Sequence, residues 1–228
     1  QLWTARQWQL FMVWYHKNKD VDLTTFNVPH RITVWTDQSW KKYFIAYLMD
    51  TARFFVYPYT SFVSNCGDSG THCASGDFVL TQVPLPLEYS VSSMRLAKVT
   101  SSLIKYDTFF EISPDILRRN SRLNGIDFDV DLAGAKQAKN FTKEYVLSSK
   151  PCKDPVISFG NALIPLETNI IAETEGGYLS LGKVKDFNEQ TGVFGRLLTR
   201  FVNREILTSQ ACKDLLKTKL LTKLGLSK

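Results

Sequence analysis

The chain has 228 residues, of which 44% are hydrophobic and 13% aromatic, a composition typical of a globular protein with a core. Its net charge of +6 resides in residues 196–228, where eight Lys or Arg stand against Glu205 and Asp214. The rest of the chain is balanced, which argues against a nucleic-acid-binding protein, whose basic residues are usually spread over the fold. A local basic segment suits an anionic membrane surface better.

The four cysteines show no metal-binding spacing. Cys66 and Cys73 flank a polar loop and could pair, but reduced thiols in a cytoplasmic protein are the simpler interpretation. No apolar run approaches the ~18–20 residues of a membrane span. The first residues resemble the middle of a helix, so we expect the chain to be a fragment of a longer cytoplasmic protein.

Residues 3–16 are predicted to form a helix, because Trp3, Trp8, Phe11 and Trp14 recur near helical spacing, and we expect Trp8 to be buried. Residues 28–35 indicate a short strand. Residues 39–52 indicate an amphipathic helix that packs on an aromatic strand at 54–57, ended by Pro58. The apolar stripe of this helix comprises Trp40, Phe44, Ile45 and Leu48.

A polar, glycine-containing loop follows at 64–77. A short helix is expected from Pro114 to near Gly125. Residues 127–132 alternate acidic and apolar side chains, as in a half-exposed or edge strand. Further strands are predicted near Val146 and at 156–159 and 169–172, with a hairpin turn at 175–178. From Gly195 onward the chain is predicted to be helical. The prediction is therefore an α/β fold with a mixed sheet, packed helices and a C-terminal helical tail.

Asp37 stands where extended chain gives way to the predicted helix at 39–52. A carboxylate in that place is typical of a helix cap. It can also leave one oxygen free to accept a proton, as a general base does. On spacing alone the cap is the simpler interpretation.

The run WTDQSWKKYFIAYLMDTARFFVYPYTSFVSNCGDSGTH, residues 35–72, is similar to the acceptor-side half of inverting GT-A glycosyltransferases of the family-2 kind. It resembles a bacterial polysaccharide-type subgroup in which the usual acidic pair is reduced to one Asp after a small polar residue, here Thr36. Residues 131–152 and 161–171 resemble the same subgroup. This resemblance implies that Asp37 is the general base.

The resemblance also implies a nucleotide-sugar donor and a divalent metal, Mg or Mn, bound mainly by a DxD motif expected upstream of Gln1. The letter pattern DxD also occurs at Asp127, Asp129 and Asp131, but a strand with acidic residues on one face explains these residues better. His72, in the loop with Asp68, is the candidate that joins the metal or the diphosphate. An ordinary exposed loop is the alternative for both residues.

For the acceptor, which would be a saccharide or a lipid-linked saccharide, the substrate-binding candidates are Arg6, Trp8, Trp40 and Asp68. An arginine suits a phosphate and an indole ring stacks on a sugar, although Trp at helical spacing is more often core. His16 and His30 are interpreted as structural. We expect residues 1–112 to form the acceptor-side half and 113–228 an accessory region ending in the basic helix. The alternative function is a non-catalytic carbohydrate-binding or interaction domain.

Overall fold

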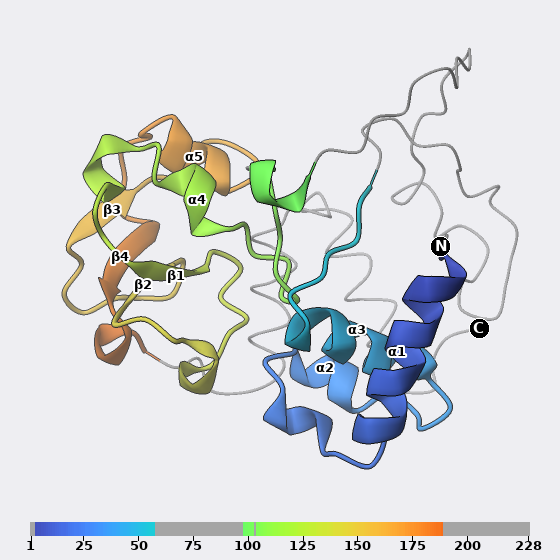
Figure 1. Ribbon diagram of the computed structural model, residues 1–228. Helices are drawn as coiled ribbons and strands as arrows, with labels where there is room; N and C mark the ends of the chain where they lie inside the picture. The colour runs from blue at the N-terminus through green and yellow to red at the C-terminus, as the bar shows by residue number, and fades with distance from the viewer. Residues whose placement is uncertain (1–2, 58–97, 103, 189–228) are drawn as a thin grey trace, which may run out of the picture. The chain divides into compact units, whose positions relative to one another are not determined.

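The computed structural model describes residues 3–57, 98–102 and 104–188 (Figure 1). The chain divides into two compact units, one comprising Gln1–Arg53 with Leu103–Glu205 and the other Phe54–Ser102 with Ile206–Lys228. The first unit contains a helical segment and a sheet segment. The expected loop at 64–77 and the expected C-terminal helix both lie outside the described residues, as do Pro58, Cys66 and Cys73.

The helical segment is built on α1 (Ala5–Asn18) and α3 (Trp40–Asp50). Both helices were predicted from their apolar spacing, and both are confirmed. Thr4 caps α1 by accepting a hydrogen bond from the Gln7 amide, and the Gln7 side chain accepts one from the Thr4 amide in return. This reciprocal pair satisfies two backbone donors that the helix itself leaves unpaired.

An aromatic core joins these two helices. Phe11 of α1 is 1% exposed, and its ring lies 5.4 Å from Phe44 and 5.5 Å from Tyr47 of α3, measured between ring centroids. Further along, the Trp14 indole N–H donates to a carboxylate oxygen of Asp50 at 2.7 Å. Successive residues of α1 contact successive residues of α3, so the two helices run in the same direction. The first turn of α3 therefore lies against the first turns of α1.

Two of the predicted strands in this part of the chain are wrong. Residues 28–35 contain the short helix α2 (His30–Thr33), which begins after Pro29, and the Ile32 amide donates to the Pro29 carbonyl at 2.8 Å. Residues 54–57 pair with no described strand, and Phe54 and Phe55 are 41% and 40% exposed. Helix α3 packs on α1 rather than on a strand.

The sheet segment has four strands, β1 (Phe128–Asp131), β2 (Tyr145–Ser148), β3 (Ile157–Phe159) and β4 (Leu179–Lys183). Their order is β1-β2-β4-β3. Strands β1 and β2 are parallel, with Asp131 opposite Ser148, and the other two pairings are antiparallel. The predicted mixed α/β sheet is confirmed, including the strands near Val146 and at 156–159.

Short helices surround the core of the sheet segment. Helix α4 (Pro114–Leu117) contacts β1 and α5 (Glu167–Ile171). The predicted strand at 169–172 is wrong, because the Asn169 amide both donates to and accepts from the Leu163 backbone and so holds the turn in a helix. The 3-10 helices are Leu23–Thr25, Val99–Ser101, Ser121–Leu123, Ala138–Asn140 and Val184–Asp186.

The expected hairpin turn at 175–178 does lead into β4, but α5 separates it from β3, so the two strands are not joined by a tight turn. None of the described helices has the length and apolar content that crossing a membrane requires.

Candidate functional site

Asp37 lies in the turn before α3 and is not its cap. The N-cap residue is Ser39, which makes no side-chain capping bond. The Asp37 side chain is fully exposed, and its Oδ1 accepts a hydrogen bond from Lys42 Nζ at 2.9 Å. That hydrogen bond, together with the positive charge of Lys42, holds the pKa of the Asp37 carboxyl below its usual value. The carboxyl is therefore ionised at neutral pH and can accept a proton.

Two of the candidate substrate-binding residues meet beside this turn. The rings of Trp8 and Trp40 have centroids 6.3 Å apart, and Trp3 lies 5.5 Å from Trp8 and 6.1 Å from Trp40. Trp40 is the first residue of α3, three positions after Asp37. The structure thus brings Trp8, Trp40 and the turn that carries Asp37 to the same end of the helix pair.

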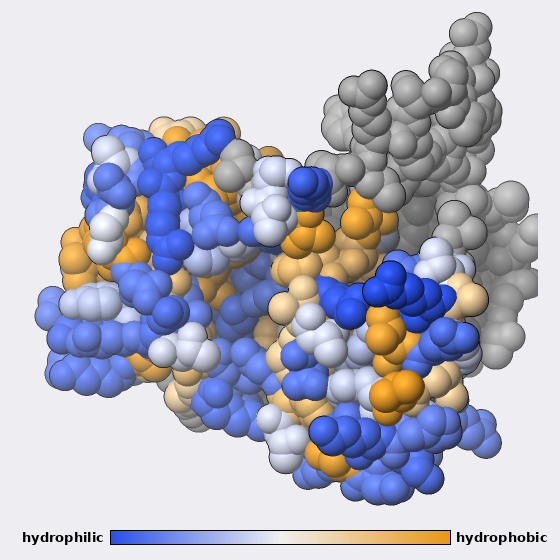
Figure 2. Space-filling view, in the orientation of Figure 1, coloured by the Kyte–Doolittle hydropathy of each residue, from blue (hydrophilic) through white to orange (hydrophobic). Residues whose placement is uncertain are grey.

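The expectation that Trp8 is buried is wrong, because 43% of the residue is exposed, as is 39% of Trp40. The face of α1 that packs on α3 is centred on Phe11 and Trp14, and Trp8 lies at its edge. Over α1 the surface in Figure 2 mixes hydrophobic with hydrophilic residues, and Leu10 and Val13 are exposed there. Part of each of these two tryptophans is therefore accessible to a ligand.

The remaining predicted site residues are less informative. Arg6 is exposed in the first turn of α1, close in sequence to Trp8. Asp68 and His72 lie outside the described residues. His16 and His30 are both exposed, and the His30 ring contacts the Thr33 hydroxyl within α2 at 3.3 Å.

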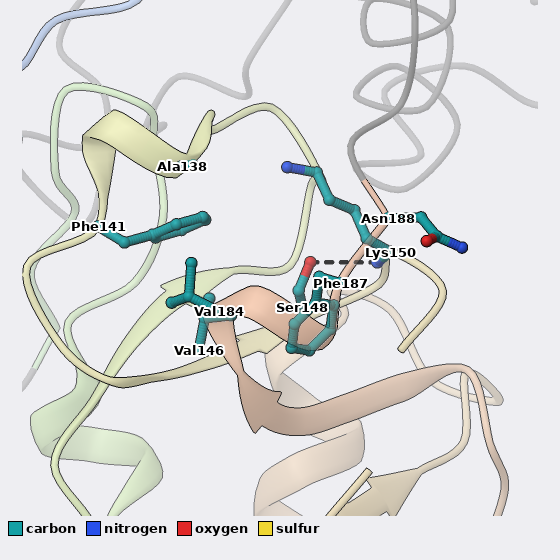
Figure 3. Close-up of a pocket in the computed structure, with 8 residues that line it drawn as sticks. All are labelled: Ala138, Phe141, Val146, Ser148, Lys150, Val184, Phe187 and Asn188. Carbon is teal, nitrogen blue, oxygen red and sulfur yellow. Dashed lines mark hydrogen bonds between the residues drawn. The ribbon is translucent and has the colours of Figure 1, made fainter. Parts of the chain in front are cut away.

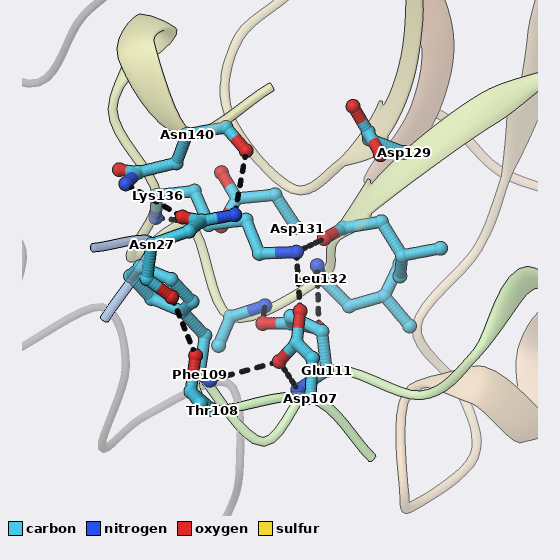
Figure 4. A network of polar contacts seen from close by, with 12 residues as sticks. Asn27, Asp107, Thr108, Phe109, Glu111, Asp129, Asp131, Leu132, Lys136 and Asn140 are labelled. Atoms are coloured by element: carbon cyan, nitrogen blue, oxygen red, sulfur yellow. Dashed lines mark hydrogen bonds and ion pairs between the residues drawn. The ribbon is translucent and has the colours of Figure 1, made fainter. Parts of the chain in front are cut away.

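The three aspartates at 127, 129 and 131, whose spacing matches a DxD motif, each bind different groups. Asp127 pairs with Arg118 at 3.1 Å and Lys143 at 2.6 Å. Asp129 accepts the backbone amides of Thr142 and Lys143, and in Figure 4 it lies apart from the network around Asp131. The interpretation as a strand is confirmed.

Asp131 was expected on a half-exposed or edge strand. Strand β1 does lie at an edge of the described sheet, but Asp131 at its carboxyl end is 0% exposed. Its Oδ1 accepts the Lys136 amide at 2.9 Å, and its Oδ2 pairs with Lys150 Nζ at 2.9 Å. Burial raises the pKa of the Asp131 carboxyl, and the Lys150 ammonium opposes that effect. Asp131 is therefore an internal counter-ion.

The network around Asp131 extends to the segment before α4 (Figure 4). The buried Glu111 carboxylate accepts the amides of Leu132 and Ala133, both at 3.0 Å. Lys136 Nζ pairs with Asp107 at 2.6 Å and also donates to a backbone carbonyl of β1. These bonds tie the connection after β1 to the 107–111 turn, which is a structural role.

A small hollow adjoins this network, lined in part by Phe141, Ser148, Lys150 and Phe187 (Figure 3). Its volume is about 20 Å³, which is room for about one water molecule. The Lys150 ammonium is already engaged by Asp131 and by the backbone carbonyl of Lys136. The hollow is too small for a sugar, so we assign it no part in binding an acceptor.

Comparison with protein-family models, with curated proteins and with solved structures finds no match for this chain. Sequence reasoning missed Lys42 and the ion pairs of Asp131 and Asp107. Nothing in the sequence separates Lys42, which is buried on α3, from its exposed neighbour Lys41.

Proposed function

We propose that the chain is the acceptor-side half of an inverting glycosyltransferase. In this proposal a sugar passes from a nucleotide-sugar to a saccharide or lipid-linked acceptor during bacterial surface polysaccharide synthesis, with Asp37 as the general base. The observation that carries the proposal is an exposed, ionised carboxylate three residues before Trp40, whose partly exposed ring packs against that of Trp8. The resemblance of residues 35–72 to this enzyme class supports it.

The reaction needs a base at this place. As the acceptor hydroxyl oxygen forms its bond to the anomeric carbon, the bond from that carbon to the nucleoside diphosphate breaks and the hydroxyl proton must leave. A carboxylate within hydrogen-bonding reach takes that proton. A single displacement inverts the anomeric centre and requires only one such base.

The indole rings suit the acceptor. A pyranose ring presents C–H groups on its faces, and these pack against the face of an aromatic ring, which carries partial negative charge. Trp8 and Trp40 would hold the sugar while its hydroxyl is directed to Asp37. Arg6 would bind a phosphate of a lipid-linked acceptor.

The metal and the donor are assigned elsewhere in the protein. The described residues contain no cluster of three His, Cys, Asp or Glu that could hold a metal ion. The proposal leaves the donor diphosphate to an upstream DxD motif and to His72 and Asp68.

The second candidate, a non-catalytic carbohydrate-binding domain, rests on the same indole pair without any need for Asp37. Asp37→Asn separates the two candidates. In the full-length protein we expect transfer to fall by roughly 10²–10⁴-fold, the usual contribution of a general base. Binding of the nucleotide-sugar should be nearly unchanged.

The experiment measures the restoration of surface polysaccharide in cells that lack the gene, together with transfer from a panel of labelled nucleotide-sugars to extracted lipid-linked acceptors. Asp20→Asn is the matched control, because the Asp20 side chain is 88% exposed and lies in the loop after α1. Full activity of Asp37→Asn would leave only the binding function. Loss of activity in both variants would point to instability instead.

The basic segment at residues 196–228 suggests where in the cell the protein acts. Residues 196–228 lie outside the described residues, but each basic residue near an anionic bilayer contributes about 1 kcal/mol. We propose salt-sensitive, peripheral attachment at the cytoplasmic face of the inner membrane. Flotation with anionic liposomes at low salt tests it, because a chain ending at Gly195 should then be recovered less than the full chain.

A further inference from the structure

Lys42 is buried on α3 although its neighbour Lys41 is exposed. Its side chain is 6% exposed, and its ammonium donates to the Trp35 carbonyl at 3.1 Å and to Asp37 Oδ1 at 2.9 Å. Both acceptors belong to the turn that precedes α3. Lys42 therefore fixes this turn to the helix from within the protein.

The same bond leaves half of the Asp37 carboxylate free. Oδ1 is engaged by Lys42, whereas Oδ2 has no partner among the described residues, and the side chain as a whole is fully exposed. An exposed aspartate without such a bond would sample several rotamers. Here one oxygen is held by Lys42, and the other has no partner among the described residues.

We infer that Lys42 is a positioning residue for Asp37, whose buried ammonium holds one carboxylate oxygen so that the other can accept the proton of the acceptor hydroxyl. This inference rests on the proposed function. Catalytic bases are commonly oriented by a third group in this manner. Lys42 itself touches no substrate in this arrangement.

The charges around the pair are few. Within the described residues, the group that faces the Lys42 ammonium besides Asp37 is Tyr43, whose ring centroid lies 5.1 Å away. The contact with Asp37 raises the pKa of Lys42, so the ammonium stays charged across the working range. Removing it should raise the pKa of the Asp37 carboxyl and move the acidic limb of the activity profile to higher pH.

The test compares Lys42→Met, which keeps an unbranched apolar side chain, with Lys42→Gln, which keeps a donor without the charge, and with Lys42→Arg, which keeps both. Lys41→Met is the control, since it removes an exposed lysine from the adjacent position. Carboxyl-carbon NMR follows the titration of Asp37. Steady-state kinetics across pH follow the transfer reaction in the same protein.

We expect Lys42→Met to raise the Asp37 pKa and to lower kcat by about 10–100-fold, a part of the full general-base contribution, with little change in the KM for the donor. Lys42→Arg should recover most of the activity. If Lys42→Met fails to fold, Lys42→Gln supplies the same comparison.

Two results overturn the inference. One is an Asp37 pKa that is the same in Lys42→Met and Lys41→Met. The other is a raised pKa with unchanged kcat and pH profile. Wild-type activity of Asp37→Asn would instead refute the proposed function, and the titration would still report whether the two side chains interact.

Discussion

Phe11→Ala should remove the support on which the candidate site stands. Phe11 is 1% exposed, and its ring centroid lies 5.5 Å from that of Trp8 and 6.4 Å from that of Trp40. A buried Phe removes about 150–250 Å² from water, which at 25 cal/mol per Å² gives about 4–6 kcal/mol as an upper bound. Because alanine keeps the Cβ, we expect a loss of about 3–5 kcal/mol in the free energy of unfolding.

The assay is urea denaturation followed by tryptophan fluorescence. All five tryptophans lie within residues 1–40, so the signal reports the helical segment alone. Val13→Ala is the control, because Val13 is on the same helix but 72% exposed, and its effect should stay within about 0.5 kcal/mol. A loss below about 1 kcal/mol for Phe11→Ala, or a loss equal to that of the control, would refute the packing described for α1 and α3.

Three further predictions concern the sheet segment and use far-UV circular dichroism during denaturation. Gly160→Ala should cost about 1–3 kcal/mol, because its Cβ would lie 2.4 Å from a backbone carbonyl oxygen; an unchanged midpoint would contradict this. Lys150→Met should cost about 3–5 kcal/mol by leaving Asp131 buried without its ammonium partner, and a stabilised variant would show that the pair is dispensable. The hydrogen bond from Lys105 lowers the pKa of Asp115, so this pair contributes stability above the ordinary carboxyl pKa and loses it as pH falls through the native value. Lys105→Met should therefore flatten the acid dependence of the unfolding midpoint, and an unaltered dependence would count against the pair.

The helices and strands that could be predicted from the sequence are those whose own pattern determines them. Helices α1 and α3 have apolar residues at helical spacing, and β2 and β3 are β-branched or apolar runs. The predictions from the sequence were wrong where a contact between residues outside the local pattern determines the secondary structure. Residues 169–172 look like a strand, but the Asn169 side chain binds the Leu163 backbone and favours a helix. Residues 54–57 have strand composition, yet strands form only where a partner lies alongside.

The candidate site could be predicted in part. The order of residues indicated Asp37, and the aromatic content near the start of the chain indicated Trp8 and Trp40. Their proximity depends on how α1 packs on α3, which no local pattern contains. Lys42 was missed because a lysine on an amphipathic helix is usually a solvated residue, and only the structure shows which lysine points inward.

Buried lysines give a way to compare the carboxylates of this protein. Among the described residues the buried lysines are Lys42, Lys136 and Lys150, and each pairs with an aspartate. Asp131 has both oxygens engaged, by Lys150 and by a backbone amide. Asp107 also has both engaged, because Oδ1 accepts two backbone amides and Oδ2 binds Lys136.

If Asp37→Asn kept its activity, Asp68 and Asp107 would be the next candidates for the base. Asp68 lies outside the described residues, and both oxygens of Asp107 are already engaged. Asp37 differs because one of its oxygens is bound and the other has no partner within the described part of the chain. An ion pair with a buried lysine stabilises a turn in all three cases. Of these three aspartates, Asp37 alone keeps an oxygen without a partner among the described residues, and under the proposed function that oxygen is the one that accepts the proton.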